Sequence, residues 1–186
     1  MATKVLLNAD VRGIDSHGVA RLSGYVRLWE AKRINANPVI KIIHETPSTA
    51  TVDGDAGLGL VVAPQAMQIA IDKAKNVGTG WVSVQNSNHF GIAGFHAMMA
   101  LEHDMIGIAM TNASALVAPT FSIEKMLGTN PIAVAIPANK QPAFVADFAT
   151  TTAANGKLEI LQRKNASTPL GWCKIKKAMK VPMLML

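Results

Sequence analysis

The stretch at residues 86–91, Asn-Ser-Asn-His-Phe-Gly, most constrains what this chain can fold into. It follows an apolar run at residues 81–84, which predicts a buried β-strand, and it precedes a helical pattern that begins near residue 92. A polar turn between a strand and a helix is typical of the edge of an open α/β sheet at which ligands bind. The sequence therefore predicts an α/β fold with His89 at a functional edge.

A second polar motif, Asp-Ser-His-Gly-Val-Ala-Arg, lies upstream at residues 15–21. His17 and Arg21 are four positions apart, so a helix would place both on one face. An imidazole exchanges protons near neutral pH, and a guanidinium can hold a carboxylate through two parallel hydrogen bonds. Each residue also has a structural interpretation: Ser16 can cap a helix beside an incidental His17, and Arg21 can be a surface arginine. For His89 the corresponding alternative is a loop histidine without a chemical role.

The rest of the pattern alternates between helical and extended periodicity. Helices are expected at residues 3–12, 18–33, 61–76, 92–103 and 151–164, and strands at 39–45, 49–53, 81–85, 105–111, 131–137 and 143–148. Alternating elements of this kind predict a layered α/β domain, and the early hairpin favours a mixed sheet over a purely parallel one. The other histidines, at positions 44, 96 and 103, lie inside these elements and are expected to be structural.

The composition narrows the class of protein. The chain has 186 residues, of which 49% are apolar, and no apolar run approaches the roughly 20 residues of a membrane span. No signal peptide is recognisable, and the single cysteine, Cys173, fits a reducing compartment, so a cytoplasmic protein is expected. The net charge is +6, but four lysines lie in the last thirteen residues, and without them the charge is +2. The other basic residues form no stripe, which argues against the alternative of a nucleic-acid binder.

Several familiar motifs are missing. The pair Gly57 and Gly59 lacks the third glycine of a dinucleotide-binding fingerprint, and no P-loop, zinc-type spacing or nucleophile elbow is present. A nicotinamide cofactor would thus bind without the Rossmann turn, and no metal is expected. Two later turns carry candidate ligand groups: Thr129 and Asn130, which turn chemistry also explains, and Asp147, which could bind a ribose hydroxyl.

Four segments together are more specific than any one alone: residues 12–22, 86–94, 127–133 and 147–157. With them the chain resembles the type-2 malate/L-lactate dehydrogenase family, which includes L-sulfolactate and ureidoglycolate dehydrogenases and a diketogulonate reductase. The resemblance covers about residues 3–172. It implies a non-Rossmann fold that binds NAD or NADP, a homodimer with its active site near the subunit interface, and interconversion of a 2-hydroxy acid with its 2-oxo acid.

The resemblance also implies roles for individual residues. His89 would be the acid/base, and Ser16, His17 and Arg21 would contact the substrate, with Thr129 and Asn130 as further substrate-binding candidates. The expected cofactor-binding residues are Asn112, Ala113, Asp147, Phe148 and Ala149. Residues 1–60 would form the substrate and dimerisation part, 61–165 an incomplete NAD(P)-binding part, and 166–186 an atypical tail.

The chain departs from the family in three places. The family usually has one or two more helices before residue 1, often has a Gly-Gly pair where this chain has Ser122 and Ile123, and continues about as long again after residue 172. The lysine- and methionine-rich tail can be read in another frame as a family-like string, so a lost base near the Trp172 codon is one hypothesis. The alternative to an active enzyme is therefore an inactive truncated fragment or pseudoenzyme. In such a fragment we expect the helices at 61–76 and 92–103 to have partly uncovered apolar faces.

Overall fold

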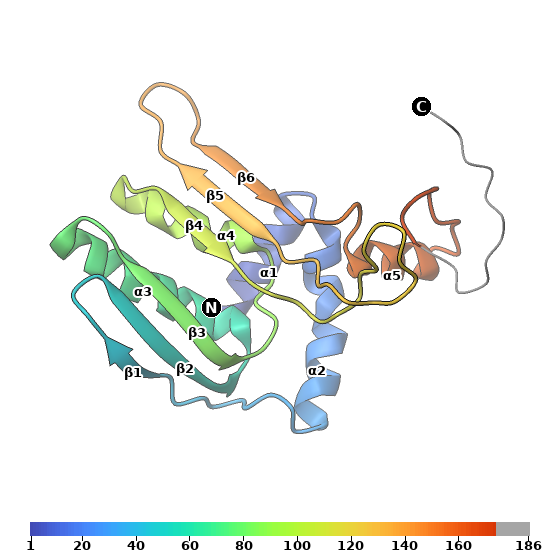
Figure 1. Ribbon diagram of the computed structural model, residues 1–186, viewed down its shortest axis with the longest axis horizontal. Helices are drawn as coiled ribbons and strands as arrows, with labels where there is room; N and C mark the ends of the chain where they lie inside the picture. Colours follow the sequence, from blue (N-terminus) through green and yellow to red (C-terminus); the bar gives the residue numbers. More distant parts are fainter. Residues whose placement is uncertain (174–186) are drawn as a thin grey trace. The chain divides into compact units, whose positions relative to one another are not determined.

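In the computed structural model, which describes residues 1–173, six strands form two three-stranded sheets (Figure 1). In the first sheet, β1 (Lys41–Glu45) pairs antiparallel with β2 (Thr49–Gly57), which pairs parallel with β3 (Trp81–Ser87). In the second sheet, β4 (Gly107–Met110), β5 (Ile132–Ile136) and β6 (Phe144–Phe148) are antiparallel neighbours. The predicted hairpin and the mixed strand directions are confirmed.

The chain divides into two compact units. The first comprises residues 1–111 and 131–148 and contains both sheets with the four helices α1 (Ala2–Val11), α2 (Leu22–Glu30), α3 (Gly59–Val77) and α4 (Ala93–Met98). The second comprises residues 112–130 and the chain from Ala149 onward, with α5 (Asn155–Arg163). The predicted partition at residues 60 and 165 concerns binding roles and stays a prediction.

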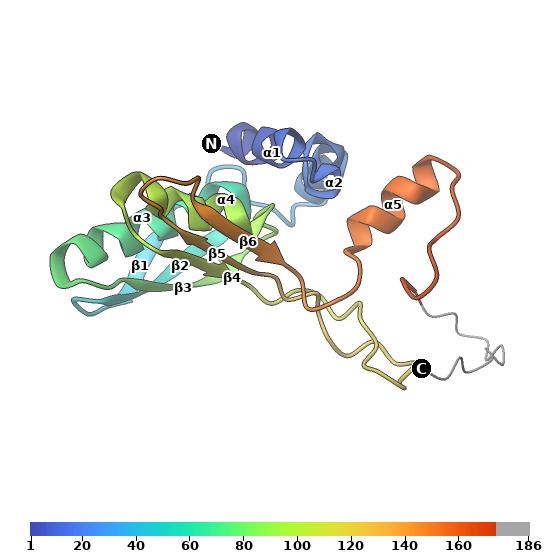
Figure 2. The ribbon, with the colours of Figure 1, turned by 90° about the horizontal axis from the view of Figure 1, so that it is seen from above.

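Within the first unit, α3 and α4 cover the same face of the sheets (Figure 2). Helix α4 lies close to β5 because small residues meet between them. Ala93 and Ala97 of α4 lie against Ala133 and Ala135 of β5, and all four are fully or almost fully buried. Helix α3 ends at Gly78, whose φ of +85° is the left-handed conformation in which glycine is favoured. The predicted helix at 92–103 is confirmed as α4 followed by the 3₁₀ turn η3 (Met99–His103).

The opposite face of the sheets carries exposed apolar side chains. Strand alternation puts Ala109 and Val145 on the helix-covered side, so their strand neighbours Met110 and Phe144 point the other way, and these are 56% and 60% exposed. On β3, Trp81 is 53% exposed. The prediction of a buried strand at 81–84 is therefore wrong, because only one face of β3 has a covering layer. The expectation of partly uncovered helix faces stays a prediction, since Val61 and Met67 of α3 and Met98 of α4 are only half-buried, and a sheet face is open as well.

The motif at residues 15–21 is not one helical face. The expected helix at 18–33 begins only at Leu22, and the motif forms two 3₁₀ turns, η1 (Asp15–His17) and η2 (Val19–Arg21). Gly18 separates the turns with an extended backbone, at φ −85° and ψ −150°. His17 and Arg21 therefore come from different turns, and the predicted shared face is wrong.

The second unit is described by its own contacts. Val117 and Leu127 form an isolated antiparallel bridge, and Lys157 Nζ lies 5.7 Å from the ring centroid of Trp172. The predicted tail at 166–186 lies outside the described residues from position 174 on. Among the helices of residues 1–173, none has the length and apolar character needed to span a bilayer.

Candidate functional site

The candidate site is built on the loop that follows β3. Asn88 fixes this loop because its side-chain amide donates to the carbonyl oxygen of Ala56 at 2.8 Å and to that of Gly57 at 3.3 Å. Gly59, the first residue of α3, lies against the other side of the loop, where a Cβ would collide with the backbone of Asn88 and His89. The loop is thus held on both sides, and His89 starts from a fixed backbone.

The imidazole of His89 is held by two hydrogen bonds to one nitrogen. The hydroxyl of Tyr25 on α2 lies 2.8 Å from Nδ1, and the backbone N–H of Gly91 donates to the same atom at 3.2 Å. Gly91 reaches this position with a φ of +81°, and a Cβ there would lie 2.8 Å from a methyl group of Val5. The loop and α2 together therefore orient the His89 ring.

His17 stacks on His89, with ring centroids 5.5 Å apart and an interplanar angle of 22°. The Nδ1 atom of His17 is 2.9 Å from the hydroxyl oxygen of the buried Ser16. The local turn that presents them is held by Asp10, whose carboxylate accepts a hydrogen bond from the backbone N–H of Val19 at 2.9 Å. Gly18 is required beside it, because a Cβ would occupy the position of that carboxylate. The structure thus brings Ser16, His17 and His89 together, as the sequence predicted.

Arg21 acts on the same group of side chains through Tyr25. Burial raises the pKa of Tyr25 to about 12, while the positive charge of Arg21 and its hydrogen bond to the tyrosine act in the opposite direction. The Tyr25 residue is only 6% exposed. Arg21, which the sequence predicted to hold a substrate carboxylate, therefore also interacts with Tyr25.

The surrounding protein and the neighbouring positive groups favour neutral His89. Desolvation, followed by the charges of His17 and Arg21, lowers the pKa of His89 from 6.5 to about 4. The residue as a whole is nevertheless exposed to solvent. With its pKa lowered, His89 is neutral at pH 7, and its exposure makes it reachable by a ligand.

A second histidine supports the loop from inside. His96 on α4 is 1% exposed, and its Nε2–H donates to the carbonyl oxygen of Phe90 at 2.8 Å. Its ring stacks on Phe90 at a centroid distance of 4.8 Å and meets Phe95 edge-on at 5.5 Å. Burial lowers the pKa of His96 to about 4. The structural role predicted for His96 is confirmed.

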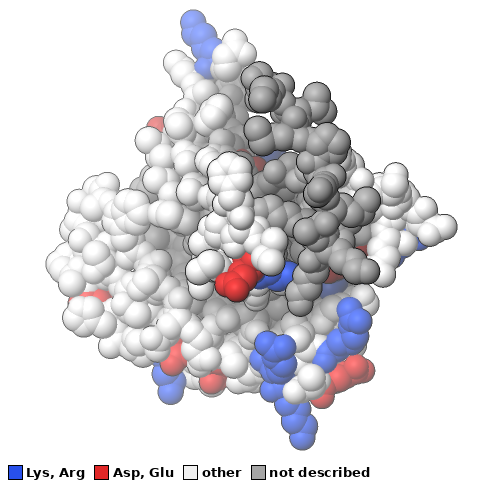
Figure 3. Space-filling view, turned by 45° about the vertical axis from the view of Figure 1, so that its right-hand side comes forward, with Lys and Arg blue, Asp and Glu red and all other residues white. Residues whose placement is uncertain are grey.

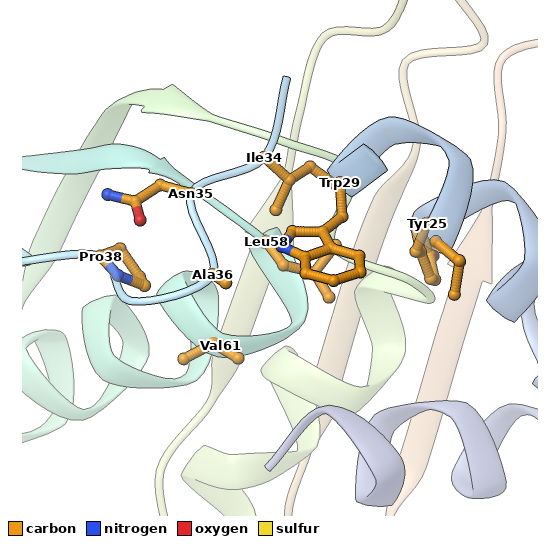
Figure 4. Close-up of a pocket in the computed structure, with 9 residues that line it drawn as sticks. Tyr25, Trp29, Ile34, Asn35, Ala36, Pro38, Leu58 and Val61 are labelled. Carbon is orange, nitrogen blue, oxygen red and sulfur yellow. The ribbon is translucent and has the colours of Figure 1, made fainter. Parts of the chain in front are cut away.

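An apolar pocket of about 280 Å³ adjoins Tyr25 (Figure 4). It lies between α2 and the start of α3, and its lining residues are Tyr25, Val26, Trp29, Ile34, Asn35, Ala36, Pro38, Leu58 and Val61. None of these side chains is charged. An anionic group of a ligand would therefore be held by the side of Tyr25 that carries Arg21 and the histidines, and not by this pocket.

The remaining predicted residues belong to the end of β6 and to the second unit. Asp147 and Phe148 end β6, and the Asp147 carboxylate accepts the backbone N–H of Gly94 in the first turn of α4 at 2.7 Å. In the second unit, Asn130 accepts the backbone N–H of Ala113 through its side-chain oxygen at 3.0 Å. The carbonyl of Thr129 accepts both the backbone N–H and the hydroxyl of Thr150, at 2.9 and 3.1 Å.

The residues predicted to bind a dinucleotide cofactor differ in their exposure. Asn112 and Ala113 are exposed, and the Asn130 bond ties their loop to the following turn, so the loop presents polar backbone and side-chain groups at a surface. Ala149 is half-buried just after β6. Asp147 is exposed although it caps α4, so its carboxylate is reachable as a hydrogen-bond acceptor for a ribose hydroxyl. The carboxylate of Asp147 is thus chemically suited to accept a hydrogen bond from a ribose hydroxyl.

Sequence reasoning missed three residues of the site: Tyr25, Asp10 and Asn88 as a loop anchor. Tyr25 is the only tyrosine of the chain, and it lies four positions after Arg21 in a segment expected to be helical, which was an available signal. No sequence signal pointed to Asp10, because its hydrogen-bond partner Val19 is nine positions away.

The described residues hold no cluster of metal ligands, and the described part of the face drawn in Figure 3 has no positive band. Among residues 1–173, no three His, Cys, Asp or Glu side chains gather as metal ligands would. On the described part of the face in Figure 3, positive and negative side chains are interspersed and no continuous positive band is visible.

The known proteins that this chain resembles in sequence are dehydrogenases of hydroxy acids. The family model described as malate/L-lactate dehydrogenase matches residues 1–177. A malate dehydrogenase of Pyrococcus abyssi is 54% identical over 167 residues, which are 90% of this chain and 46% of that protein. An L-sulfolactate dehydrogenase of Methanocaldococcus jannaschii is 48% identical over 90% of this chain and 48% of its own length.

Solved structures agree with the sequence relatives. The crystal structure of a malate dehydrogenase from Entamoeba histolytica superposes with a TM-score of 0.85 at 40% identity, over 89% of this chain and 46% of that one. The chain thus spans about half the length of the curated relatives it matches.

Proposed function

Because the chain belongs to the malate/L-lactate dehydrogenase family, we propose that it carries the proton-transfer half of an NAD(P)-dependent oxidoreductase. The reaction would interconvert a 2-hydroxy acid, such as malate, L-lactate or a sulfolactate, with its 2-oxo acid. The observation that supports this most is the group formed by His17, Tyr25 and His89, with ring and hydrogen-bond contacts between segments far apart in sequence. A 2-hydroxy acid needs such a group because its hydroxyl proton must move when the carbon is oxidised.

His89 suits the proton step. Its ring is neutral at pH 7 and oriented by Tyr25 and Gly91, and the residue is exposed to solvent. His17 is stacked beside it and can bind a polar group of the same ligand. Arg21 supplies positive charge for a carboxylate, and the buried Ser16 holds the His17 ring. Thr129 and Asn130 remain proposed as further substrate-binding residues.

Bound NAD or NADP would accept the hydride in oxidation and supply it in reduction. We propose Asn112, Ala113, Asp147, Phe148 and Ala149 as its binding residues, because the loop at 112–113 and the end of β6 present exposed polar groups. A homodimer in the cytoplasm, with the substrate site near the subunit interface, is proposed from the family resemblance.

The alternative is an inactive fragment or pseudoenzyme. The open sheet face, with Trp81, Met110 and Phe144 exposed, favours that alternative for the isolated chain, because exposed apolar patches of this kind promote association.

The test compares turnover and binding by the purified chain. Reduction of oxaloacetate, pyruvate and sulfopyruvate is followed by the loss of NADH or NADPH absorbance, beside a full-length protein restored to the family length. Turnover by both supports the enzyme, and turnover by the long form alone supports the fragment. A thermal melt with and without cofactor separates binding from chemistry, since a bound ligand raises the melting temperature. No turnover by either form overturns the proposed function.

A further inference from the structure

The hydrogen bonds at His89 determine which ring nitrogen carries its proton. A backbone N–H can only donate, so Gly91 requires a lone pair on Nδ1. The neutral ring of His89 therefore has its proton on Nε2. Because Nδ1 has no proton to give, the Tyr25 hydroxyl at 2.8 Å must be the donor in that contact.

The tyrosine is itself ordered by Arg21. A guanidinium has donors only, so its hydrogen bond with Tyr25 occupies a lone pair of the phenol oxygen. That contact leaves the phenol hydrogen for His89. The three residues thus form a chain of donors that runs from Arg21 to Tyr25 and from Tyr25 to Nδ1 of His89.

We propose that Tyr25 is a positioning residue that, held by Arg21, keeps His89 neutral and presents its Nε2–H to the substrate oxygen. In reduction, the Nε2–H of this neutral ring donates a hydrogen bond to the carbonyl oxygen of a 2-oxo acid and is the proton that the oxygen takes up as hydride arrives, which leaves an imidazolate whose Nδ1 keeps its two donors. This inference rests on the proposed function for its substrate. It also gives Arg21 a role through the tyrosine, besides the clamp on a substrate carboxylate.

The order of donors has a measurable consequence for protonation. Protonating Nδ1 would break the Gly91 bond and would turn Tyr25 into an acceptor for two cationic neighbours, with its own hydrogen left in a buried position. Removing the phenol hydroxyl relieves the second conflict. The charged and titratable groups that act on His89 among the described residues, His17 and Arg21, are not themselves substituted by that removal. The phenol therefore has its own contribution to the protonation equilibrium of His89.

The experiment uses the 186-residue chain with ¹⁵N-labelled histidine and long-range proton–nitrogen NMR. In the native chain we expect the His89 signals of an Nε2–H neutral ring at pH 7. In Tyr25→Phe, protonation of His89 should become about tenfold easier, which corresponds to one hydrogen bond of ordinary strength. Trp29→Phe is the matched control, because it removes part of an aromatic side chain from the same helix and leaves the Tyr25, Gly91 and His17 contacts of His89 in place. An unchanged His89 titration in a folded Tyr25→Phe chain overturns the proposal.

A second measurement follows Tyr25 without replacing it. Because Tyr25 is the only tyrosine, growth on 3-fluorotyrosine labels this position alone. The chemical shift of the ¹⁹F signal should change with pH at the same midpoint as the His89 imidazole. This change should be absent in His89→Gln. A ¹⁹F signal that stays flat through the His89 titration also overturns the proposal. Neither NMR measurement needs turnover, so an inactive chain would count against the proposed function and not against the role of Tyr25.

Discussion

The hydroxyl of Tyr25 lies 2.8 Å from Nδ1 of His89, although the two residues are 64 positions apart in the sequence. This contact joins α2 to the loop after β3 and is the one that best relates the fold to the proposed chemistry. It also connects the buried side of the site, where Tyr25 is 6% exposed, with the exposed residue His89.

Replacing His89 with alanine should lower the rate of 2-oxo acid reduction by about 10²–10⁴-fold in the form of the protein that turns over. The reason is that no other imidazole is both oriented by Tyr25 and open to a ligand. The measurement is kcat under saturating cofactor, with His103→Ala as the control because His103 lies on η3, away from this loop. Near-normal kcat in His89→Ala would return His89 to a structural role.

Gly59→Ala should destabilise the chain by about 1–3 kcal/mol, because the new methyl group meets backbone atoms of Asn88 and His89 that cannot move away cheaply. Gly24→Ala is the matched control: Gly24 lies within α2, and a Cβ there meets nothing within 4 Å. That second change should stabilise the chain by about 0.5–1 kcal/mol through helix propensity. Urea unfolding of both variants provides the comparison, and equal effects would mean that α3 does not pack on the loop as described.

The chain should lose stability in mild acid. The pKa of His96 falls from 6.5 in the unfolded chain to about 4 when folded, so its contribution is complete above pH 6.5 and is lost as the pH falls through about 4. For this buried group the contribution is about 3 kcal/mol. Urea unfolding at pH 7 and pH 4.5 measures it, and His96→Gln should reduce the difference but not abolish it, because the pKa of His89 is lowered too. The same pH dependence in the variant would rule out His96 as a source.

The hydroxyl of Tyr25 should ionise at a higher pH than that of an exposed tyrosine. Burial raises the pKa of Tyr25 from 10.0 to about 12, so the stability it contributes is complete below pH 10 and is lost as the pH rises through about 12. A single tyrosine makes the near-ultraviolet absorbance titration easy to interpret. The folded chain should show little phenolate at pH 10.5, whereas the chain in urea should show most of it. A midpoint near 10 in the folded chain would contradict the burial of the hydroxyl.

Lysine on the open sheet face should improve solubility without a loss of stability. Met110 and Phe144 are 56% and 60% exposed, so charged replacements there cost within about 0.5 kcal/mol, as for most surface positions. Val52→Lys, on the fully buried side of β2, is the control and should unfold the chain. Light scattering against protein concentration gives the readout. If Met110→Lys and Phe144→Lys leave scattering unchanged, association does not involve this face.

The sequence predicted the order of helices and strands well, because periodic apolar positions and turn residues are local signals. Helix α3 and the β1–β2 hairpin show this most clearly: Gly78 ends the first, and Thr46-Pro47-Ser48 joins the strands of the second. The same signals failed at residues 15–21, where Gly18 has an extended backbone and the carboxylate of Asp10, eight positions earlier, fills the space beside it. A helical spacing rule has no means of detecting that contact.

The sequence predicted the histidines of the site but not their contacts with other side chains. His17 and His89 stand in polar motifs, so their chemistry could be inferred from their neighbours in sequence. Tyr25 stands in an ordinary amphipathic pattern, and its role depends on a hydrogen bond to a residue in another element. The exposure of Trp81 was missed for a related reason: an apolar run shows that a strand is apolar, and only the tertiary structure shows whether both of its faces are covered.

Asn88, whose amide donates to the carbonyl groups of Ala56 and Gly57, has a consequence for how the molecule folds. Those contacts close loops of more than thirty residues, whereas the β1–β2 hairpin closes through a few neighbouring positions. Long loops close later because their ends lose more chain entropy. The His89 loop should therefore acquire its shape after the hairpin exists. In native-state hydrogen exchange, the Gly91 amide should open before those of β2, so the region proposed to handle protons is also the first to loosen.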